Sequence, residues 1–325
     1  MKDKLYGVLA PVKKYGLFVA IGILALLPMV VSKTYILGLL CRVLMYATLA
    51  GSLNVINGYS GQMCIGHAGF FCIGSYVEAI LATRMGISFW VLLPLAGAAA
   101  ALMGLFVALP TLKMRGVYLA IITLGFSEII RLLALNWTDV TGGAMGIKNI
   151  PVPRLGGIEF SNARTYIIFL AIAVLFLFIT RCDPFPFGTG GCRSGRISCH
   201  PLAEVNTAKA VNFMYGAFWA GIIGAAYAPY ARFIDSTIYT LDEGFNILSM
   251  VIVGGMGTLT GPLAGSVVIN VLTELLRPIG QWRMVAYGVL IIVMMWFRPQ
   301  GLIGASDSVL AGRDIKMKKS GEGAK

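Results

Sequence analysis

The sequence predicts an all-α, polytopic integral membrane protein of about ten transmembrane helices, some of them interrupted by glycine-rich turns. Composition is the first reason. Of 325 residues, 58% are hydrophobic and 12% are charged, whereas an ordinary soluble domain is about 25% charged. Length is the second reason, because several apolar runs approach the ~20 residues that span a bilayer as a helix. A β-barrel would need short alternating segments instead. A soluble enzyme and a nucleic-acid-binding domain are therefore excluded.

Ten apolar runs give the count of helices, taken in order along the chain. Each run is bounded by polar or glycine-rich residues and is long enough, or nearly so, for one membrane helix. Glycines and polar residues interrupt the third run and the eighth and ninth. The predicted spans are 17–31, 35–56, 64–83, 89–109, 116–135, 165–180, 211–231, 246–259, 262–276 and 284–297.

The ends of the chain predict its orientation. The tails 1–15 and 305–325 are both rich in lysine, and they contribute to a net charge of +12. Cytoplasmic segments of membrane proteins carry an excess of lysine and arginine, so both termini are expected in the cytoplasm. An even number of spans agrees with this placement. Residues 16–304 then form the transmembrane domain between two cytoplasmic tails.

The connecting loops test the same rule. The turn at 110–115 and the loop at 181–210 are basic, and both fall on the cytoplasmic side. The acidic loop at 232–245 falls on the outer side. The loop at 136–164 carries basic residues although it falls outside, so it is the exception to the predicted orientation.

Two clusters mix glycine with hydroxyl and amide side chains at the junctions between apolar runs. Non-helical backbone at membrane depth is tolerated where protein or a water-filled cavity covers it, and interrupted spans point to a transport path. An equally open interpretation is a pair of tight turns with packing glycines. The candidate pathway residues are Asn57, Gly58, Ser60, Gly61 and Gln62 in the first cluster, and Gly254, Gly255, Gly257 and Thr258 in the second.

Ionisable side chains inside spans are costly, so they are further candidates for the pathway. His67 and Glu78 share one helix face but are separated by about 16 Å, which prevents direct contact. His67 is interpreted either as a pathway residue or as a hydrogen-bonded contact between helices. Glu128 and Arg131 are three residues apart and can form an ion pair on one face.

Catalytic and metal sites find little support. Gly58-Tyr-Ser-Gly61 has the form of the serine motif of rhomboid-type intramembrane proteases. Such a serine needs a histidine within hydrogen-bond distance, but His67 is seven residues after Ser60, about 10 Å away if the segment is helical. The cysteines at 182, 192 and 199, with His200, lack the close spacing of zinc ligands. No phosphate-binding loop is present in the sequence. The chain is therefore not expected to be an enzyme or to hold a metal or cofactor.

Several motifs together resemble the permease subunits of branched-chain amino-acid ABC importers, of the LivM type. They are Asn57-Gly-Tyr-Ser-Gly-Gln62, Gly66-His-Ala-Gly-Phe-Phe71, Arg115-Gly-Val-Tyr-Leu-Ala-Ile-Ile-Thr-Leu124, Val253-Gly-Gly-Met-Gly-Thr-Leu259 and Phe297-Arg-Pro-Gln-Gly-Leu302. The resemblance implies uptake of leucine, isoleucine, valine or related compounds through the bacterial inner membrane. It also implies the partners of such importers: a second permease subunit, two cytoplasmic ATPase subunits and a periplasmic substrate-binding protein.

One segment departs from the family pattern. The resemblance implies that a cytoplasmic helix within 181–210 docks on the ATPase, with Ala203, Glu204 and Asn206 as candidate docking residues. Residues 183–201 are rich in proline, glycine and cysteine, which disfavour a helix. Two compensating frameshifts and genuine divergence are both open explanations.

Two other functions remain as alternatives. An ion-coupled secondary transporter or channel would use the same interrupted spans, with Glu78 or Glu128 as the carboxylate whose protonation cycles. An intramembrane serine protease based on Ser60 is the third interpretation.

Overall fold

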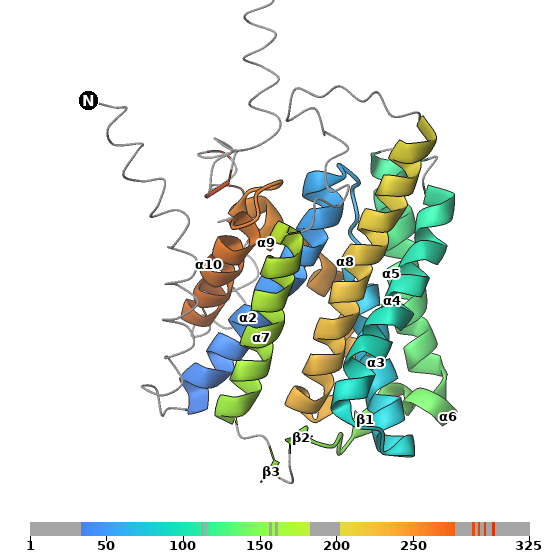
Figure 1. Ribbon diagram of the computed structural model, residues 1–325, viewed down its shortest axis with the longest axis vertical. Helices are drawn as coiled ribbons and strands as arrows, with labels where there is room; N and C mark the ends of the chain where they lie inside the picture. Colours follow the sequence, from blue (N-terminus) through green and yellow to red (C-terminus); the bar gives the residue numbers. More distant parts are fainter. Residues whose placement is uncertain are drawn as a thin grey trace, which may run out of the picture.

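The computed structural model describes residues 34–111, 114, 116–155, 158–159, 162–182, 202–276, 288–289, 292, 296 and 301–302. Helices make up most of this part, as Figure 1 shows. Eight predicted spans have a helix at their position. These helices are α2 (Thr34–Asn54), α3 (His67–Met85), α4 (Phe89–Thr111), α5 (Val117–Asn136), α7 (Asn162–Cys182), α8 (Leu202–Ala231), α9 (Leu241–Gly254) and α10 (Gly261–Leu275).

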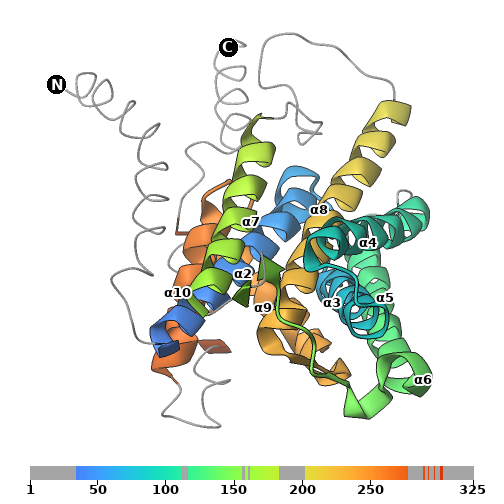
Figure 2. The same cartoon turned by 60° about the horizontal axis from the view of Figure 1, so that its bottom comes forward.

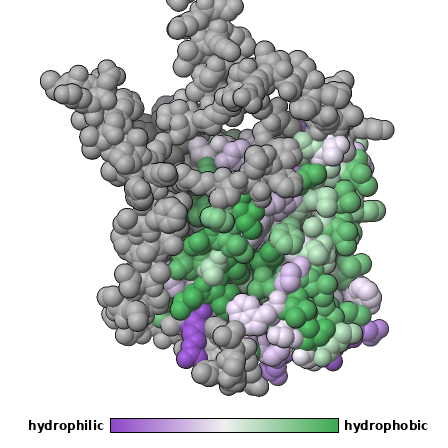
Figure 3. Space-filling view, viewed as in Figure 1, coloured by the Kyte–Doolittle hydropathy of each residue, from purple (hydrophilic) through white to green (hydrophobic). Residues whose placement is uncertain are grey.

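Two predicted spans cannot be compared in the same way. The span 17–31 lies outside the described residues, and most of 284–297 does as well. Among the described helices, three are long and apolar enough to cross a membrane by themselves: Tyr35–Tyr59, Phe89–Thr111 and Val117–Asn136. Apolar side chains cover most of the described surface in Figure 3, and hydrophilic ones gather at its lower edge. The predicted class, a mostly helical membrane protein, agrees with both observations.

The helices form two groups (Figures 1 and 2). Helices α2, α7, α9 and α10 pack together as the α2 group, and α3, α4, α5 and α8 pack together as the α8 group. Contacts between α2 and α8 join the groups. The glycine-rich turn after α2 and the one between α9 and α10 lie close to this boundary.

Glycines let three helices of the α8 group approach closely. A Cβ at Gly74 of α3 would stand 2.2 Å from the carbonyl oxygen of Gly221 in α8. A Cβ at Gly221 would stand 2.5 Å from the Cβ of Ala100 in α4. Small residues at such interfaces are typical of membrane helices, so these glycines are packing residues.

Short strands lie at one end of the bundle. Strand β1 (Ile147–Lys148) pairs antiparallel with β4 (Phe233–Ile234), with Ile147 opposite Ile234. Strand β2 (Arg154–Leu155) pairs with β3 (Ile158–Glu159). The single-turn helix α6 (Thr138–Thr141) lies at the same end, at the bottom of Figure 1. We call this end the strand end. The sequence did not predict these strands, because two residues carry no periodicity.

Several boundaries differ from the predicted spans, and those of α8 and α9 differ most; α9 begins at Leu241 rather than at 246. Helix α8 begins at Leu202 rather than at 211, so 202–210 is helical and the predicted loop 181–210 ends earlier. The predicted span did not include 202–210 because these residues are partly polar. Alanine, glutamate and lysine are nevertheless good helix formers. Helix α9 ends at Gly254 rather than at 259, because Gly255 has a φ of 113° that is incompatible with a helix.

Candidate functional site

The two glycine clusters meet in the structure, although some 200 residues separate them. Gly58 lies in η1, a π-helical turn over Val55–Tyr59, and Gly257 lies between α9 and α10. A Cβ at Gly58 would stand 2.4 Å from the backbone nitrogen of Gly257 and 2.9 Å from its Cα. Only a residue without a side chain fits at this distance. We call this contact, with the adjacent Asn54, the glycine junction.

Asn54, the last residue of α2, holds the junction together. Its Nδ2 donates to the carbonyl oxygen of Thr258 at 2.8 Å, and its Oδ1 accepts from the backbone N–H of Gly257 at 2.9 Å. Both backbone groups belong to a segment without helical hydrogen bonds. Since unpaired backbone groups are costly where water is excluded, this one amide stabilises the break between α9 and α10.

Other polar residues of the first cluster fix the backbone between α2 and α3. Asn57 spans its own loop, donating to the carbonyl oxygen of Cys64 at 3.1 Å and accepting from its N–H at 3.0 Å. Ser60 accepts a hydrogen bond from Asn212 of α8 at 2.7 Å. The clusters therefore connect to both helix groups.

Gly61 and Gln62 behave differently from Gly58. Gly61 has a φ of +65°, and no atom lies within 4 Å of the position that a Cβ would take. Gly61 therefore makes no close backbone approach, and its left-handed backbone is the feature that favours glycine there. Gln62 is buried, and its Oε1 has no hydrogen-bond partner among the described residues.

His67 joins two helices. Its Nε2 lies 2.8 Å from the Ser52 hydroxyl of α2. This contact favours the interpretation of His67 as an interhelical hydrogen-bonding residue. Ser60 has other partners, namely Asn212 and the Val55 carbonyl oxygen. A serine–histidine pair for proteolysis is therefore not formed between Ser60 and His67.

The second cluster forms a turn closed by its own side chain. Thr258 donates its hydroxyl to the Gly255 carbonyl oxygen at 2.9 Å and accepts from the Gly261 N–H at 3.1 Å. A Cβ at Gly254 would stand 2.1 Å from the Gly261 carbonyl oxygen. The backbone N–H of Leu302 donates to the Val253 carbonyl oxygen at 2.9 Å, so Leu302 contacts this site from near the end of the chain.

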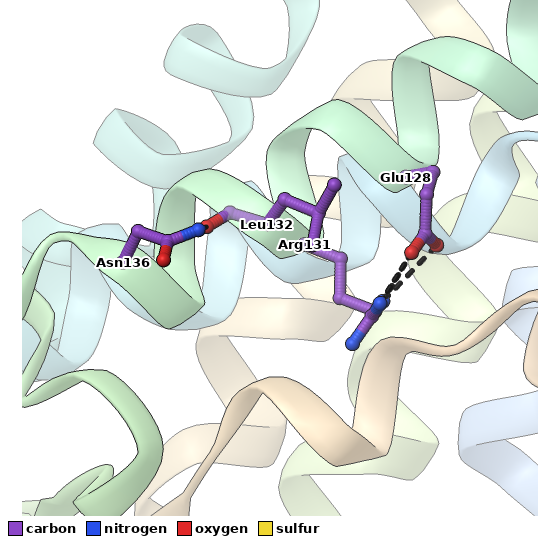
Figure 4. Close-up of polar contacts among 4 residues, drawn as sticks. All are labelled: Glu128, Arg131, Leu132 and Asn136. Carbon is purple, nitrogen blue, oxygen red and sulfur yellow. Dashed lines mark hydrogen bonds and ion pairs between the residues drawn. The ribbon is translucent and has the colours of Figure 1, made fainter.

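The two candidate carboxylates lie away from the junction. Glu128 forms the predicted ion pair with Arg131, whose Nε lies 3.0 Å from both carboxylate oxygens (Figure 4). Glu78 is 1% exposed, and its Oε2 has no hydrogen-bond partner among the described residues. No hydrogen bond within the described part of the chain joins either carboxylate to the glycine junction.

Sequence reasoning missed two residues of this site. Asn54 and Asn212 were not singled out, yet both bridge segments that are far apart in the chain. Their signal was present: each is an amide inside an apolar run, where polar side chains usually bond across helices. Within the residues that the structure describes, no group of His, Cys, Asp or Glu could hold a metal ion. Cys192, Cys199 and His200 lie outside them.

Comparison with known proteins gives consistent matches. Residues 35–192 and 203–297 match the family model of the permease component of branched-chain amino acid transport systems. The chain is 36% identical over 288 residues to the high-affinity branched-chain amino acid transport system permease protein LivM of Salmonella typhimurium, covering 80% of this chain and 68% of the relative. The corresponding protein of Escherichia coli is 35% identical with the same coverage. No solved structure matches the chain.

Proposed function

The chain belongs to the branched-chain amino acid transport permease family, and from this premise we propose how its described features serve transport. It is a membrane-embedded permease subunit of an ABC importer for branched-chain amino acids, and not an enzyme. The observation that carries the proposal is the glycine junction. Two interrupted helix pairs, α2–α3 and α9–α10, meet there through the close approach of Gly58 to Gly257 and the hydrogen bonds of the Asn54 amide.

The polar backbone around this junction forms part of the translocation pathway. Broken helices expose N–H and carbonyl groups that can replace water around a polar solute. Polar groups beside the junction add to this surface: the hydroxyl of Ser60 and the buried side-chain amide of Gln62. Between them, Gly61 leaves space where a side chain would stand. The proposed pathway residues around the junction are Asn57, Gly58, Ser60, Gly61, Gln62, Gly254, Gly255, Gly257 and Thr258. His67 and Glu78 in α3 and Glu128 in α5 are further candidates outside the junction.

The importer is a complex, and this chain supplies one part of it. A second permease completes the pathway, a periplasmic protein delivers the substrate, and two cytoplasmic ATPases supply the energy. The chain needs no cofactor of its own. Ala203, Glu204 and Asn206 belong to the first turns of α8, which continues without interruption to Ala231. A continuous helix can carry motion from a docked ATPase into the bundle.

In the bacterial inner membrane the chain has ten spans and cytoplasmic termini. The strand end then faces the periplasm, and the start of α8 faces the cytoplasm. This arrangement follows from the basic tails 1–15 and 305–325. It places the glycine junction toward the cytoplasmic half, because Asn212 lies within the third turn of α8.

Uptake into vesicles that contain the complete complex tests the function. Leucine, isoleucine or valine is expected to accumulate with ATP and the binding protein, and not after ATP depletion. The Glu78→Gln variant distinguishes an ion-coupled carrier, since its unpartnered buried carboxylate is the group that such a carrier would protonate. Uptake that continues after ATP depletion but stops in the Glu78→Gln variant would contradict the ABC mechanism.

A further inference from the structure

A cavity of ≈ 340 Å³ lies between the two helix groups, away from the glycine junction. Helices α2 and α9 line it from one group, and α3 and α8 line it from the other. Its volume falls at the lower end of the range for small-molecule sites, about 300–1,000 Å³. The residues that matter for its chemistry are Arg42, Tyr46, Phe71, Tyr227, Tyr230 and Glu243.

The cavity lies toward the strand end. Tyr230 is next to the last residue of α8, and Glu243 is in the first turn of α9. These two helix ends flank β4 (Phe233–Ile234), which pairs with β1 at the strand end. With the proposed orientation, a solute arriving from the periplasm meets this cavity before it meets the glycine junction.

Opposite charges line the cavity without neutralising each other. Arg42 is an exposed residue of α2 and makes no hydrogen bond or ion pair with any described residue. An arginine inside a span is costly unless it is paired or solvated, and such residues mark solute paths. Glu243 lines the cavity from the first turn of α9, and its carboxylate lies near the side chains of Tyr46 and Asn246.

The rest of the lining is apolar and aromatic. Met45, Phe71 and Ile238 supply aliphatic and aromatic surface. The Phe71 and Tyr227 ring centroids lie 5.4 Å apart, so the aromatic wall is packed. Tyr230 is held by a hydrogen bond from its hydroxyl to the Gly38 carbonyl oxygen at 3.3 Å. A preformed wall loses little entropy when a ligand binds.

We propose that this cavity is an α-amino-acid binding site within the permease. The guanidinium of Arg42 binds the carboxylate, as its planar donors suit, and the Glu243 carboxylate binds the ammonium group. The branched side chain packs against Met45, Phe71 and Ile238. The site rests on the proposed function and deepens it, because the permease would then recognise its substrate itself rather than only let it pass.

The boundary position gives the site a part in transport. The two helix groups contribute different halves of the lining, so a shift of one group against the other changes the cavity. Binding that prefers one arrangement shifts the population toward it by its difference in affinity. The site can thereby report an occupied permease to the ATPases.

The first test uses the unmodified complex without its substrate-binding protein, held in lipid nanodiscs. Radiolabelled L-leucine is displaced by 4-methylpentanoate, which lacks the ammonium group, and by 3-methylbutylamine, which lacks the carboxylate. Leucine is expected to bind about tenfold or more tightly than either analogue, because each lacks one charge-assisted contact. Equal affinities for the three compounds, or no leucine binding, would overturn the proposal.

The second test assigns the two contacts to their residues. Arg42→Gln is expected to weaken leucine about tenfold and to leave the amine unchanged, and Glu243→Gln is expected to weaken leucine and leave the carboxylic acid unchanged. Arg84→Gln and Asp242→Asn are matched controls, since both residues lie outside the cavity lining. Leucine affinities of the Arg42 and Glu243 variants that equal those of the controls would place the site elsewhere and refute the proposal.

Uptake by the complete importer separates this proposal from the proposed function. If wild-type vesicles accumulate leucine with ATP but the complex binds leucine no more tightly than the two analogues, the binding site is refuted and the proposed function stands. Vesicles that accumulate no branched-chain amino acid under any energy source refute the function. Since the analogue series needs no variant, misfolding of Arg42→Gln leaves the first test decisive.

Discussion

At the residue scale, Asn54 illustrates how one side chain can replace missing secondary structure. Its amide supplies both a donor and an acceptor to backbone that has left the helix at Gly255. An ionised carboxylate could not do both at once, because it only accepts hydrogen bonds. The contact also requires that Gly58, one turn further along, has no side chain.

A methyl group at Gly58 is therefore expected to open the junction. In Gly58→Ala the new Cβ would stand 2.3 Å from the Asn54 Oδ1 and 2.4 Å from the Gly257 nitrogen. Overpacking of this kind costs about 1–3 kcal/mol, and uptake is expected to fall to background while the protein still inserts. The checks are vesicle uptake and the amount of monodisperse protein after extraction.

Gly125→Ala is the matched control for this substitution. Gly125 lies in α5 with no atom within 4 Å of its Cβ position. Alanine within a helix is favoured over glycine by about 0.5–1 kcal/mol, so uptake and stability are expected to hold. Normal uptake in Gly58→Ala would reduce the junction to an incidental contact.

The Glu128–Arg131 pair predicts a coupled effect on stability. The two side chains are 30% and 21% exposed on α5, so the pair lies between the surface and buried cases. Arg131→Gln leaves an unpaired carboxylate in an apolar helix face, whereas the double variant with Glu128→Gln leaves none. A double-mutant cycle on the thermal midpoint is expected to give a coupling free energy of about 1 kcal/mol. Additive effects would mean that the pair contributes nothing.

At the element scale, α8 connects the proposed cytoplasmic side to the core. It packs along α3 and α4 and also contacts α2. The family match is interrupted between residues 192 and 203, next to the start of this helix. The interruption coincides with the glycine- and proline-rich stretch, so the departure from the family is local to the connection that precedes α8.

This connection is expected to couple poorly to the ATPases. Residues 188–201 are poor helix formers, and weak substrate-stimulated ATPase activity is predicted for the complex of this chain. Replacing them with an alanine- and glutamate-rich segment of equal length is expected to raise that activity. A glycine–serine replacement of the same length is the control and should leave it low.

One result would count against this expectation, and a second measurement would explain the unusual stretch. Full stimulation by the unaltered chain would assign docking to another part of the cytoplasmic face, such as 110–115 or 298–304. Sequencing the gene separates the two explanations of the stretch, because a reading-frame slip between Phe187 and Val205 would be visible in the DNA. A confirmed frame leaves genuine divergence.

Helix boundaries show which elements the sequence could predict. Uninterrupted apolar runs predicted α4 and α5 to within two residues at each end. The start of α8 was missed because hydropathy identifies the apolar part of a helix, and α8 begins nine residues before its apolar run. The end of α9 was missed because Leu259 extends the apolar run past Gly255, where the backbone turns.

At the scale of the whole molecule, orientation is open to direct test. With cytoplasmic termini, a cysteine in place of Asn162 at the strand end is expected to react with an impermeant thiol reagent applied from outside. A cysteine in place of Ser320 is not. The background must lack the 6 native cysteines. Labelling at 320 but not at 162 would reverse the orientation and place the amino-acid cavity on the wrong side for capture.

The arrangement of the site depends on contacts that no local pattern encodes. The sequence identified both glycine clusters and the spacing of Glu128 and Arg131, since each is a short-range feature. It could not identify that Gly58 meets Gly257, or that Arg42 and Glu243 line one cavity, because such contacts depend on how helices pack. An amide inside an apolar run marks a residue that can bridge helices, but its partner is recognised only once the fold is known.

The glycine junction also sets an order of events during synthesis. Asn54 and Gly257 are 203 residues apart in the chain. At about 5–20 residues per second, translation needs about 10–40 s to cover that interval. During this time α2 resides in the bilayer with the amide of Asn54 lacking its final partner. The first interrupted helix pair therefore waits for the second, and the break between α9 and α10 can close on Asn54 only after both of those helices have been made.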